Sequence, residues 1–312
     1  MRIVRDLAKR LPGIRNLVRD RDRLLQELAT WKVRQSYPPG HYYSPVPSAN
    51  DVAGIGRKSG REQLSELPGI ALNWDAQEAL ITKLAAYYSE IPFGETKEQR
   101  GEHRYYFDNG FYCYADGILL YSLLRHLKPA KLIEIGSGFS SCLTLDVNEL
   151  FLNGTLHCTF IEPYPERLHD NMRPTDAGSA KVMVQKVQDV PLSTFDELNE
   201  SDILFIDSSH VGKASSDVNF LFFEVLPRLK PGVWIHIHDV FYPFEYPEEW
   251  ILAGRSWNEA YMLRCLLMHS SGFEINLWGD ALCTHRPDLM RSLMPMCFKN
   301  TGAGIWLRRV GK

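Results

Sequence analysis

The sequence lacks long apolar runs, paired cysteines and an excess of basic charge. Its 312 residues contain no apolar run long enough to span a bilayer, and none follows the first ten residues, so we expect neither a transmembrane helix nor a signal peptide. The six cysteines form no Cys-x-x-Cys pair, which argues against a zinc or redox motif and favours a reducing cytoplasm. The formal net charge of −3 gives no reason to expect nucleic acid as a partner.

The N-terminal section, residues 1–70, predicts a basic helix and an extended connector. Apolar residues recur at helical spacing over residues 1–33, interrupted by Pro12 and Gly13, and arginine and lysine outnumber acidic residues there. Residues 36–69 are rich in Pro, Gly, Ser and Tyr, which is typical of a connector. We interpret the helix as a solvated helix or short coiled coil that supports a homo-oligomer. The alternative is peripheral attachment to an anionic membrane or to a partner enzyme.

Residues 71–128 predict a helical cap, and residues 129–312 predict a domain of alternating strands and helices. The cap helices are expected at 73–88 and 109–127. Strands are expected at 131–135, 156–161, 180–185, 202–206 and 233–238, and helices at 140–150, 166–171, 191–198, 216–229 and 257–270. Two β-rich runs, 273–278 and 304–309, are expected to pair as an antiparallel hairpin. The predicted fold class is α/β, a Rossmann-like sheet of parallel strands with this terminal antiparallel pair and an N-terminal helical extension.

A buried strand, a glycine turn and a helix start follow one another at the beginning of this domain. Gly136 and Gly138, on either side of Ser137, allow a tight turn and the close approach of a ligand to the backbone. Free amides at the helix N-terminus favour an anionic group. Glu162, at the end of the second strand, is placed to accept hydrogen bonds from two ribose hydroxyls. Together with Glu134 before the turn, these residues predict a nucleoside cofactor.

Two cofactor classes use such a site, the dinucleotides and S-adenosylmethionine (SAM). Ser141 replaces the third glycine of Gly-x-Gly-x-x-Gly, a glycine that permits close packing around a pyrophosphate, which SAM does not contain. Acidic strand ends at Asp207 and Asp239 also suit methyl transfer better than hydride transfer. We therefore favour SAM, held by the residues above and by Asp207. Asp189, after the third strand, is placed to contact the adenine ring, although a helix-capping role fits it equally well.

Polar side chains follow the fourth and fifth strands, with Asp207 and His210 after one and His238 and Asp239 after the other. The carboxyl ends of parallel strands meet at one edge of a sheet, so we expect these groups to converge beside the cofactor. A sugar-type hydroxyl must lose its proton as it attacks a methyl group, and His210 is the predicted base. Asp207, His238 and Asp239 are candidate ligands of a divalent metal such as Mg, Mn or Fe. His236 is expected deeper in the strand as a hydrogen-bonded core residue.

Longer runs at and beyond these strand ends read IDSSHV (206–211), SDVN (216–219), LPRLKPGV (226–233), HIHDVFYPFEYP (236–247) and GRSWNE (254–259). They resemble the class I SAM-dependent methyltransferase family called methyltransferase type 24, over roughly residues 108–307. The resemblance implies the class I methyltransferase sheet and a SAM-dependent enzyme. Members of this family resemble enzymes of bacterial polysaccharide and glycan modification.

A more distant resemblance concerns the catalytic groups. Metal-dependent sugar O-methyltransferases of macrolide biosynthesis have Asp-x-x-His at the fourth strand and two adjacent acids at the fifth. Asp207 and His210 match the first element, which implies a metal ligand and a catalytic base. Asp239 matches the second acid of the other element, whereas His238 stands in place of the first.

The aromatic segment 241–257 directly follows the fifth strand. It is interpreted as a lid whose aromatic side chains stack on a sugar, namely Tyr242, Tyr246, Trp250 and Trp257. Arg255 is then placed to contact a phosphate or carboxylate of the substrate. A packed surface loop explains the segment equally well.

The sequence therefore predicts a cytoplasmic or membrane-peripheral SAM-dependent O-methyltransferase that methylates a sugar or glycan hydroxyl, with metal assistance and a histidine base. Two alternatives stay open. One is an Fe-dependent hydroxylase-like enzyme on the same scaffold, suggested by His236, His238 and Asp239. The other is a non-catalytic Rossmann-like partner of a glycan-assembly complex, docked through the basic N-terminal helix.

Overall fold

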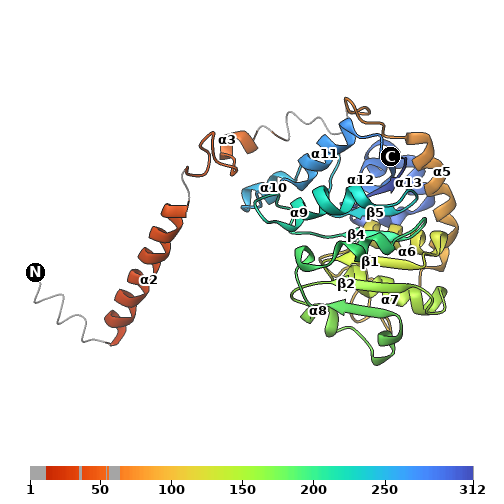
Figure 1. The fold of residues 1–312 in the computed structure, drawn as a ribbon, viewed down its shortest axis with the longest axis horizontal. Coiled ribbons are helices and arrows are strands. Elements are labelled where there is room, and N and C mark those ends of the chain that lie inside the picture. The colour runs from red at the N-terminus through yellow and green to blue at the C-terminus, as the bar shows by residue number, and fades with distance from the viewer. Residues whose placement is uncertain (1–11, 35–36, 54, 56–63, 312) are drawn as a thin grey trace, which may run out of the picture. The chain divides into compact units, whose positions relative to one another are not determined.

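The computed structural model describes residues 12–34, 37–53, 55 and 64–311 and divides the chain into two compact units, Met1–Gly54 and Ile55–Lys312 (Figure 1). The first unit contains α2 (Pro12–Arg34) and the short α3 (Ala49–Val52). α2 begins with proline, whose missing backbone N–H is no loss at the first helical position. The part of the predicted helix before Pro12 lies outside the described residues.

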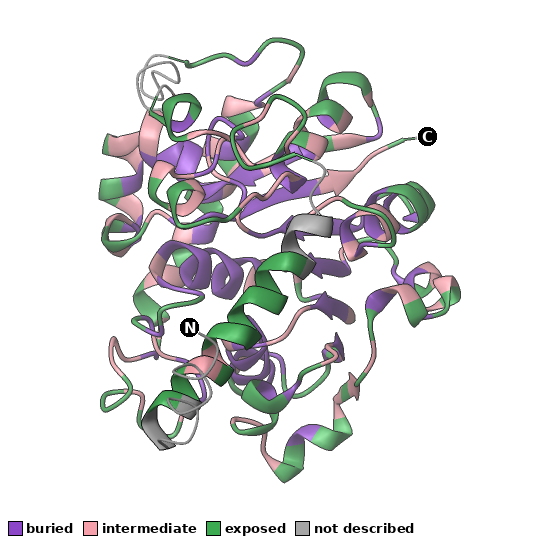
Figure 2. Ribbon diagram, turned by 90° about the vertical axis from the view of Figure 1, so that its left-hand side faces the viewer, coloured by how far each residue is buried: buried purple, intermediate pink, exposed green. Residues whose placement is uncertain are grey.

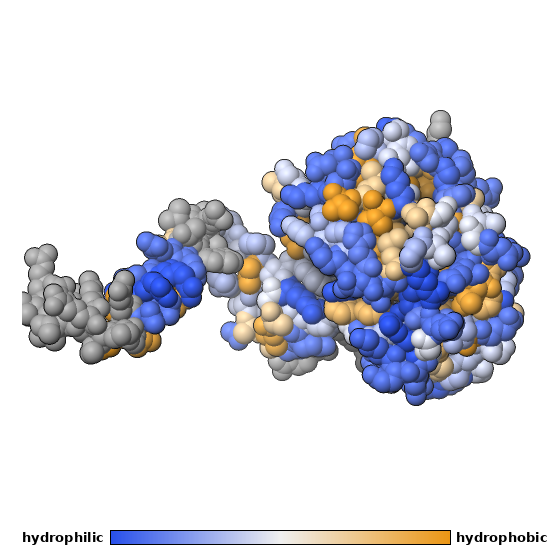
Figure 3. Space-filling view, turned by 90° about the horizontal axis from the view of Figure 1, so that it is seen from below, coloured by the Kyte–Doolittle hydropathy of each residue, from blue (hydrophilic) through white to orange (hydrophobic). Residues whose placement is uncertain are grey.

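Large apolar side chains of α2 are exposed, namely Ile14, Leu17, Leu24, Leu25 and Leu28. Across the described part of the chain, no helix combines the length and apolar character that crossing a membrane requires. One face of the molecule, seen in the space-filling view, is largely hydrophilic, with separate apolar patches on the second unit (Figure 3).

A seven-stranded sheet forms the centre of the second unit, in the order β3-β2-β1-β4-β5-β7-β6. The strands are β1 (Lys131–Ile135), β2 (His157–Ile161), β3 (Ala180–Met183), β4 (Ile203–Ile206), β5 (Trp234–Ile237), β6 (Phe273–Trp278) and β7 (Ile305–Arg309). The strands β1 to β5 pair in parallel, and β7 pairs antiparallel with both β5 and β6. Each strand lies within a predicted run, so the predicted fold class is confirmed.

The connection between the last two strands differs from the predicted hairpin. β6 and β7 do pair, but α12 (Gly279–His285) and α13 (Pro287–Leu293) lie between them in the chain. β7 also inserts between β5 and β6, so that β6 forms the edge of the sheet. The sequence analysis did not predict either helix.

Helices cover both faces of the sheet, and alternate residues of each strand point into two separate apolar layers. In β4, Ile203 and Phe205 pack in the layer of α6 (Tyr114–Leu127) and α7 (Phe139–Phe151). Leu204 and Ile206 pack in the layer of α9 (Asp217–Phe220) and α11 (Glu259–His269). Figure 2 shows the strands buried between helices whose outer faces are exposed.

Three further helices lie within predicted ones, namely α5 (Trp74–Leu84), α8 (Glu166–His169) and a 3-10 helix at Leu192–Glu197, whereas α10 (Glu248–Leu252) was not predicted. Two predicted helices differ from the observed ones for reasons that their sequences explain. The helix predicted at 216–229 changes after α9 into a π-helical turn and a 3-10 turn, because Pro227 has no N–H to continue it. The helix predicted from residue 109 begins at Tyr114, because the Asn109 side chain binds the local backbone amides of Phe111 and Tyr112 instead.

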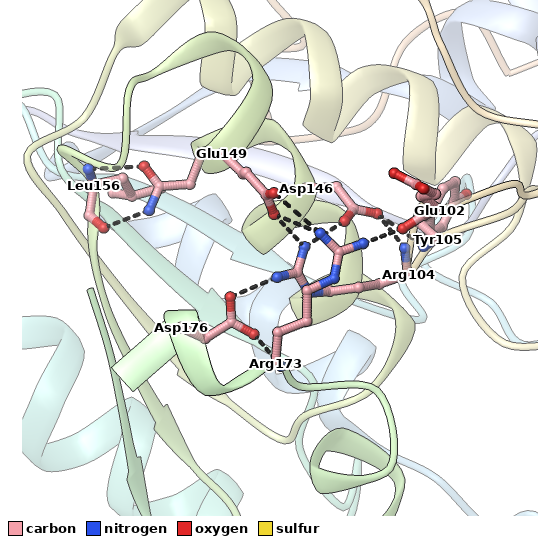
Figure 4. Close-up of polar contacts among 9 residues, drawn as sticks. Glu102, Arg104, Tyr105, Asp146, Glu149, Leu156, Arg173 and Asp176 are labelled. Carbon is pink, nitrogen blue, oxygen red and sulfur yellow. Dashed lines mark hydrogen bonds and ion pairs between the residues drawn. The ribbon is translucent and has the colours of Figure 1, made fainter. Parts of the chain in front are cut away.

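A buried ion cluster fastens the segment before α6 to the sheet domain (Figure 4). The Arg104 guanidinium contacts Asp146 of α7 at 2.6 Å and Asp176 at 2.5 Å, and all three side chains are buried. Arg173 and Arg104 both contact Glu149 at 2.9 Å. Such charges are tolerated inside a protein only when they are paired, so the cluster fixes residues 104, 146 and 176 relative to one another.

Candidate active site

Gly136 lies at the sharpest point of the turn between β1 and α7. Its φ of +79° is one that residues with a side chain rarely adopt, and a Cβ atom there would collide with the carbonyl oxygen of Asp207. The Asp207 amide donates to the Ile135 carbonyl at 2.8 Å, which holds the end of β4 against this turn. Gly138 has an extended φ of 178°, and a Cβ there would meet nothing closer than Arg167 at 3.5 Å. The backbone geometry therefore requires glycine at position 136 but not at position 138.

Glu162 follows β2 and faces the same turn. Its Oε2 accepts a hydrogen bond from the Ser137 amide at 3.1 Å, and its Oε1 accepts one from the Tyr164 amide at 2.8 Å. Each carboxylate oxygen has two lone pairs, so both oxygens keep a free position for a ligand hydroxyl. The two amides thus hold the carboxylate in place without saturating it.

A pocket of about 410 Å³ opens at the carboxyl ends of β1, β2 and β4. It is lined by Gly136, Glu162 and Asp207, three of the predicted cofactor residues. The remaining lining residues are Ile135, Ile161, Pro163, Lys186, Val187, Gln188, Ser208, Ser209, Lys213, Ser215, Ser216 and Asp217. Its volume falls in the usual range of small-molecule sites, and a nucleoside-sized ligand fits in it.

Asp189 does not line this pocket, in contrast to the predicted adenine contact. It is exposed at the end of a 3-10 turn (Val187–Asp189), and its neighbours Val187 and Gln188 face the pocket instead. The Gln188 side chain is fixed by donating to the Ser215 carbonyl at 2.9 Å. The strand ends two residues before the predicted boundary, and this difference changes which side chain the turn directs inward.

Glu134 is buried beneath the turn and is not one of the residues that line the pocket. Its Oε1 accepts hydrogen bonds from the hydroxyls of Ser140 at 2.5 Å and Ser141 at 2.9 Å, so it ties β1 to the first turn of α7. Burial raises the pKa of this carboxyl to about 8. Ser137 and Gly138 likewise shape the turn, while Gly136 lines the pocket itself.

His210 joins the acidic groups of three elements. Its Nε2 lies 3.4 Å from Oδ1 of Asp207 and 3.4 Å from Oδ2 of Asp239, and its Nδ1 lies 2.9 Å from Oε2 of Glu259. The imidazole is buried, and its backbone adopts a φ of +59°, which turns the side chain back toward the strand ends. The predicted convergence of Asp207, His210 and Asp239 is therefore seen in the structure.

Glu259 belongs to this cluster although the sequence analysis did not identify it. It lies at the first residue of α11, is 1% exposed, and accepts hydrogen bonds from the Ser208 hydroxyl at 2.9 Å and 3.0 Å. Its backbone amide donates to the His210 carbonyl at 3.2 Å. An acidic residue next to the aromatic segment was the available signal, but nothing in the spacing linked it to His210.

The charges of this cluster depend on one another. Burial by itself lowers the pKa of His210, but hydrogen bonds to Asp207 and Glu259 outweigh it and raise the pKa to about 10. Burial is the largest influence on the pKa of Asp207 and raises it, but the hydrogen bond to His210 and the charges of His238, His210 and Arg167 together outweigh it, so the pKa is lowered overall. At neutral pH the imidazole is therefore protonated. Burial also raises the pKa of Glu259, the acid that contacts its Nδ1.

His238 and His236 occupy different surroundings, as their positions on β5 predict. His236 is fully buried between Phe205 and Trp306, with ring centroids 4.1 Å and 4.5 Å away. Neither of its ring nitrogens has a hydrogen-bond partner among the described residues, so the predicted hydrogen bond was wrong, and burial lowers its pKa well below the usual value. His238 faces Tyr112 at 5.3 Å, and its Nε2 lies 3.7 Å from Asp239.

The predicted metal ligands do not form a compact group. Within the residues that the structure describes, no set of three or more His, Cys, Asp or Glu side chains is arranged to hold a metal ion. The space between the carboxylates of Asp207 and Asp239 is bridged by the protonated Nε2 of His210. A cation of the protein itself thus lies between the two carboxylates that were predicted to bind a metal and offsets part of their charge.

The aromatic segment after β5 contains buried and partly exposed rings. Tyr242 and Tyr246 are buried, so they are unsuited to the predicted stacking on a sugar. Trp250 and Trp257 are partly exposed, and the Trp257 ring packs on the His210 ring at 4.3 Å. Trp257 therefore borders the cluster formed by His210, Asp207, Asp239 and Glu259, called the His210 cluster below, and Trp250 packs on Trp257 with ring centroids 5.4 Å apart.

Comparison with known proteins assigns the chain to a family. A family model described as a methyltransferase domain matches residues 133–240, from β1 to the end of β5. An uncharacterised protein of Archaeoglobus fulgidus is 35% identical over 175 residues, which cover 55% of this chain and 78% of that protein. The chain belongs to this methyltransferase family. The family resemblance and the enzyme class predicted from the sequence are thereby confirmed.

Two solved structures are similar to this methyltransferase at low sequence identity. The O-methyltransferase TomG of Streptomyces achromogenes, in complex with SAM, is 16% identical, with a TM-score of 0.40 over 74% of this chain and 89% of that one. An SAH-bound methyltransferase of Podospora anserina is 13% identical, with a TM-score of 0.43 over 84% of this chain and 97% of that one.

Proposed function

We propose that this methyltransferase transfers the methyl group of SAM to a hydroxyl of a sugar or glycan. The observation that carries the proposal is that Gly136, Glu162 and Asp207 line one pocket while Asp207 also contacts His210. Asp207 therefore belongs both to the proposed cofactor site and to the proton-accepting groups. The six cysteines are all free thiols, which supports the proposed cytoplasmic location.

The pocket residues fit a nucleoside cofactor with a sulfonium group. Glu162 has free acceptor positions for ribose hydroxyls, and Gln188 is placed where the adenine contact was expected. Asp207 is 40% exposed, so a carboxylate faces the pocket where it can attract positive charge. SAM, when bound, supplies a methyl group on a positively charged sulfur, which makes that carbon open to attack by an oxygen nucleophile.

The His210 cluster is suited to receive the proton of an acceptor hydroxyl. Its carboxylates outnumber its single cation, so one additional proton reduces the net negative charge rather than building up positive charge. His210 contacts Asp207, Asp239 and Glu259, and a proton that reaches the cluster can be shared among them. Acceptance of the proton as the new C–O bond forms is the step that makes a poorly acidic hydroxyl reactive.

A divalent metal does not fit the donor arrangement that the structure describes. A metal between Asp207 and Asp239 would occupy the position of the protonated His210 Nε2, and His238 does not complete a third ligand. We therefore derive no step through a metal, and nothing in the described residues favours the iron-dependent alternative. Methyl transfer after EDTA dialysis is expected to be retained. Loss that Mg²⁺ restores would show that His210 moves away to admit an ion.

Calorimetry with SAM and mass spectrometry of the host glycans test the proposed function. We expect wild-type protein to bind SAM, and Glu162→Gln to weaken SAM at least tenfold, because one ribose acceptor becomes a donor. Asp189→Asn is the matched control, since Asp189 is a nearby acid outside the pocket. Deletion of the gene should remove a methyl group from a host sugar or glycan. Failure of the wild-type protein to bind SAM would overturn the proposal.

A further inference from the structure

We propose that the methyl acceptor carries an anionic group, a carboxylate or a phosphate, which binds Arg255 next to the His210 cluster. The proposal deepens the proposed function and rests on it, since it names the chemical class of the sugar. The observation behind it is the position of the Arg255 guanidinium, which stacks on two partly exposed tryptophans. This guanidinium is not paired with any carboxylate in the described residues.

The backbone and two aromatic rings fix the position of Arg255. After α10 the chain turns at Gly254, which has a φ of +93°, and the Arg255 amide then donates to the Trp250 carbonyl at 3.0 Å. The guanidinium carbon lies 4.1 Å from the centre of the Trp250 ring and 5.2 Å from that of Trp257. Stacking of this kind restricts the guanidinium plane while its N–H groups, which point outward in that plane, keep their hydrogen-bonding capacity.

Trp257 connects this guanidinium to the proton-accepting groups. Its ring packs on His210 with centroids 4.3 Å apart, so the guanidinium carbon of Arg255 is at most about 9.5 Å from the imidazole ring. One monosaccharide unit can span this distance, with a hydroxyl at the partly exposed Asp207 carboxylate beside His210 and an exocyclic acid at Arg255. Trp250 and Trp257 are both partly exposed, and their ring centroids lie 5.4 Å apart.

The Arg255 guanidinium forms no ion pair with a carboxylate of the described residues. Several arginines of the same unit form ion pairs with carboxylates, namely Arg104, Arg125, Arg173, Arg228, Arg286 and Arg308. Among the described residues Arg255 has none, and neither have Arg167 and Arg291, which stack on Phe111 and Phe298. Arg255 is exposed and has no carboxylate within ion-pair distance among the described residues, although Glu248 and Glu249 lie in the preceding helix. An exposed cation that is held rigidly and left unpaired is suited to bind an anion from solution.

The His210 cluster makes such a cation necessary for an acidic acceptor. The carboxyl groups of Asp207, Asp239 and Glu259 surround the single imidazole of His210, and the partly exposed Asp207 carboxylate repels an anionic sugar that approaches without compensation. Arg255 compensates at the far end of the acceptor, where the acid would lie. It also fixes the orientation, because only a sugar with its hydroxyl opposite its acid satisfies both ends.

Binding of paired probes tests this inference. Protein saturated with S-adenosylhomocysteine is titrated calorimetrically with three probes. They are p-nitrophenyl β-D-glucuronide, which carries a carboxylate, glucose 1-phosphate, which carries a phosphate, and the uncharged analogue p-nitrophenyl β-D-glucoside. We expect at least one acidic probe to bind five times or more tighter than the neutral glucoside, and the comparison of the two acids distinguishes a carboxylate from a phosphate. Equal affinities for all three probes would overturn the inference.

Variants show whether Arg255 is responsible. Arg255→Gln should remove the preference for the acidic probe and leave the neutral one unchanged, whereas Arg255→Lys should keep part of it because the charge remains. Arg291→Gln is the matched control, since Arg291 also stacks on a partly exposed aromatic residue, Phe298, at 4.6 Å but lies in α13. A preference that survives in Arg255→Gln would assign it elsewhere and refute the proposal. If the wild-type protein binds no S-adenosylhomocysteine, the result contradicts the proposed function itself, and this outcome is distinct from a failure of the inference about Arg255.

Discussion

The carbonyl oxygen of Asp207 occupies the space that a Cβ atom on Gly136 would need. Two strands that are distant in the chain thus meet at one point, and their contact brings the cofactor turn and the proton-accepting cluster together. The hydrogen bond from the Asp207 amide to Ile135, 2.8 Å long, maintains this contact. Binding of the cofactor and acceptance of the proton are therefore expected to respond together to changes at this position.

Gly136→Ala should disturb both functions. The added methyl group collides with backbone rather than with a flexible side chain, and the φ of +79° strains any residue other than glycine. We expect a loss of stability of about 1–3 kcal/mol and at least tenfold weaker SAM binding, measured by urea unfolding and calorimetry. Gly138→Ala is the control, because its extended backbone and open surroundings admit a methyl group. Equal effects of the two variants would contradict this account.

His210→Ala should abolish methyl transfer while SAM binding persists. The protonated imidazole holds the carboxylates of Asp207 and Asp239 where they can accept the proton, and disruption of such a proton-accepting site typically lowers the rate by about 10²–10⁴-fold. Glu259→Gln should lower kcat less than His210→Ala and leave the KM for SAM unchanged, because Glu259 acts by positioning the imidazole. His269→Ala, at the other end of α11, serves as the control.

The double variant of His210 and Glu259 separates positioning from an independent role. If Glu259 acts through His210, the double variant is no slower than His210→Ala alone, as measured by single-turnover kinetics. Multiplicative losses would show that Glu259 contributes on its own.

Glu134 makes stability depend on pH. Burial raises its pKa from 4.5 to about 8, so between these pH values the folded protein binds a proton that the unfolded chain has released. Folding stability from this group is therefore fully present below pH 4.5 and falls as pH rises toward 8. Glu134→Gln cannot ionise, and we expect it to match the wild type at low pH and to exceed it by roughly 1–3 kcal/mol near pH 8.

Thermal unfolding at several pH values measures this difference. Glu197→Gln is the control, because hydrogen bonding to Lys131 lowers the pKa of that exposed acid and its removal should bring no gain at high pH. Parallel stability curves for wild type and Glu134→Gln would show that Glu134 ionises normally.

Arg104→Met should destabilise the fold strongly. It leaves Asp146 and Asp176 buried without their cation, and removal of one partner from a buried ion pair costs about 3–5 kcal/mol. Lys131→Met, which breaks the exposed pair with Glu197, should change stability by less than about 1 kcal/mol. Urea unfolding distinguishes the two, and similar losses would mean that the cluster in Figure 4 is not the reason.

The exposed leucines of α2 are expected to pair with a second copy of the chain. Ile14, Leu17, Leu24 and Leu28 follow the alternating three- and four-residue spacing of a coiled coil, with Arg21 at one core position. Leu24→Lys combined with Leu28→Lys should convert a dimer into a monomer in light scattering. Arg23→Gln, on the polar side of the helix, should not. A monomeric wild type that binds anionic vesicles would favour the membrane alternative.

Strand positions and their convergence could be predicted from the sequence because both rest on local rules. Uninterrupted apolar runs such as residues 203–206 mark strands buried on both faces, and parallel strands place their polar ends at one edge. These two rules were sufficient to predict that Asp207, His210 and Asp239 lie close together.

Features that depend on tertiary contacts could not be predicted. Glu259 reaches His210 only because α11 starts beside β4, and the replacement of Asp189 by Gln188 in the pocket follows from a strand that ends two residues early. The prediction of a metal site did not consider that protonated His210 could occupy the space between the carboxylates. The sequence does not show the positive φ of His210, which directs its side chain between them.

The insertion of β7 between β5 and β6 imposes an order on folding during synthesis. β6 emerges first but has no neighbour in the sheet until residues 305–309 arrive, since β7 is its only partner strand in the part of the chain that the structure describes. Until then the outer side of β5 also stays open. A nascent chain halted before Arg309 would therefore present two unsatisfied strand edges at once, a state that chaperones would have to shield from aggregation.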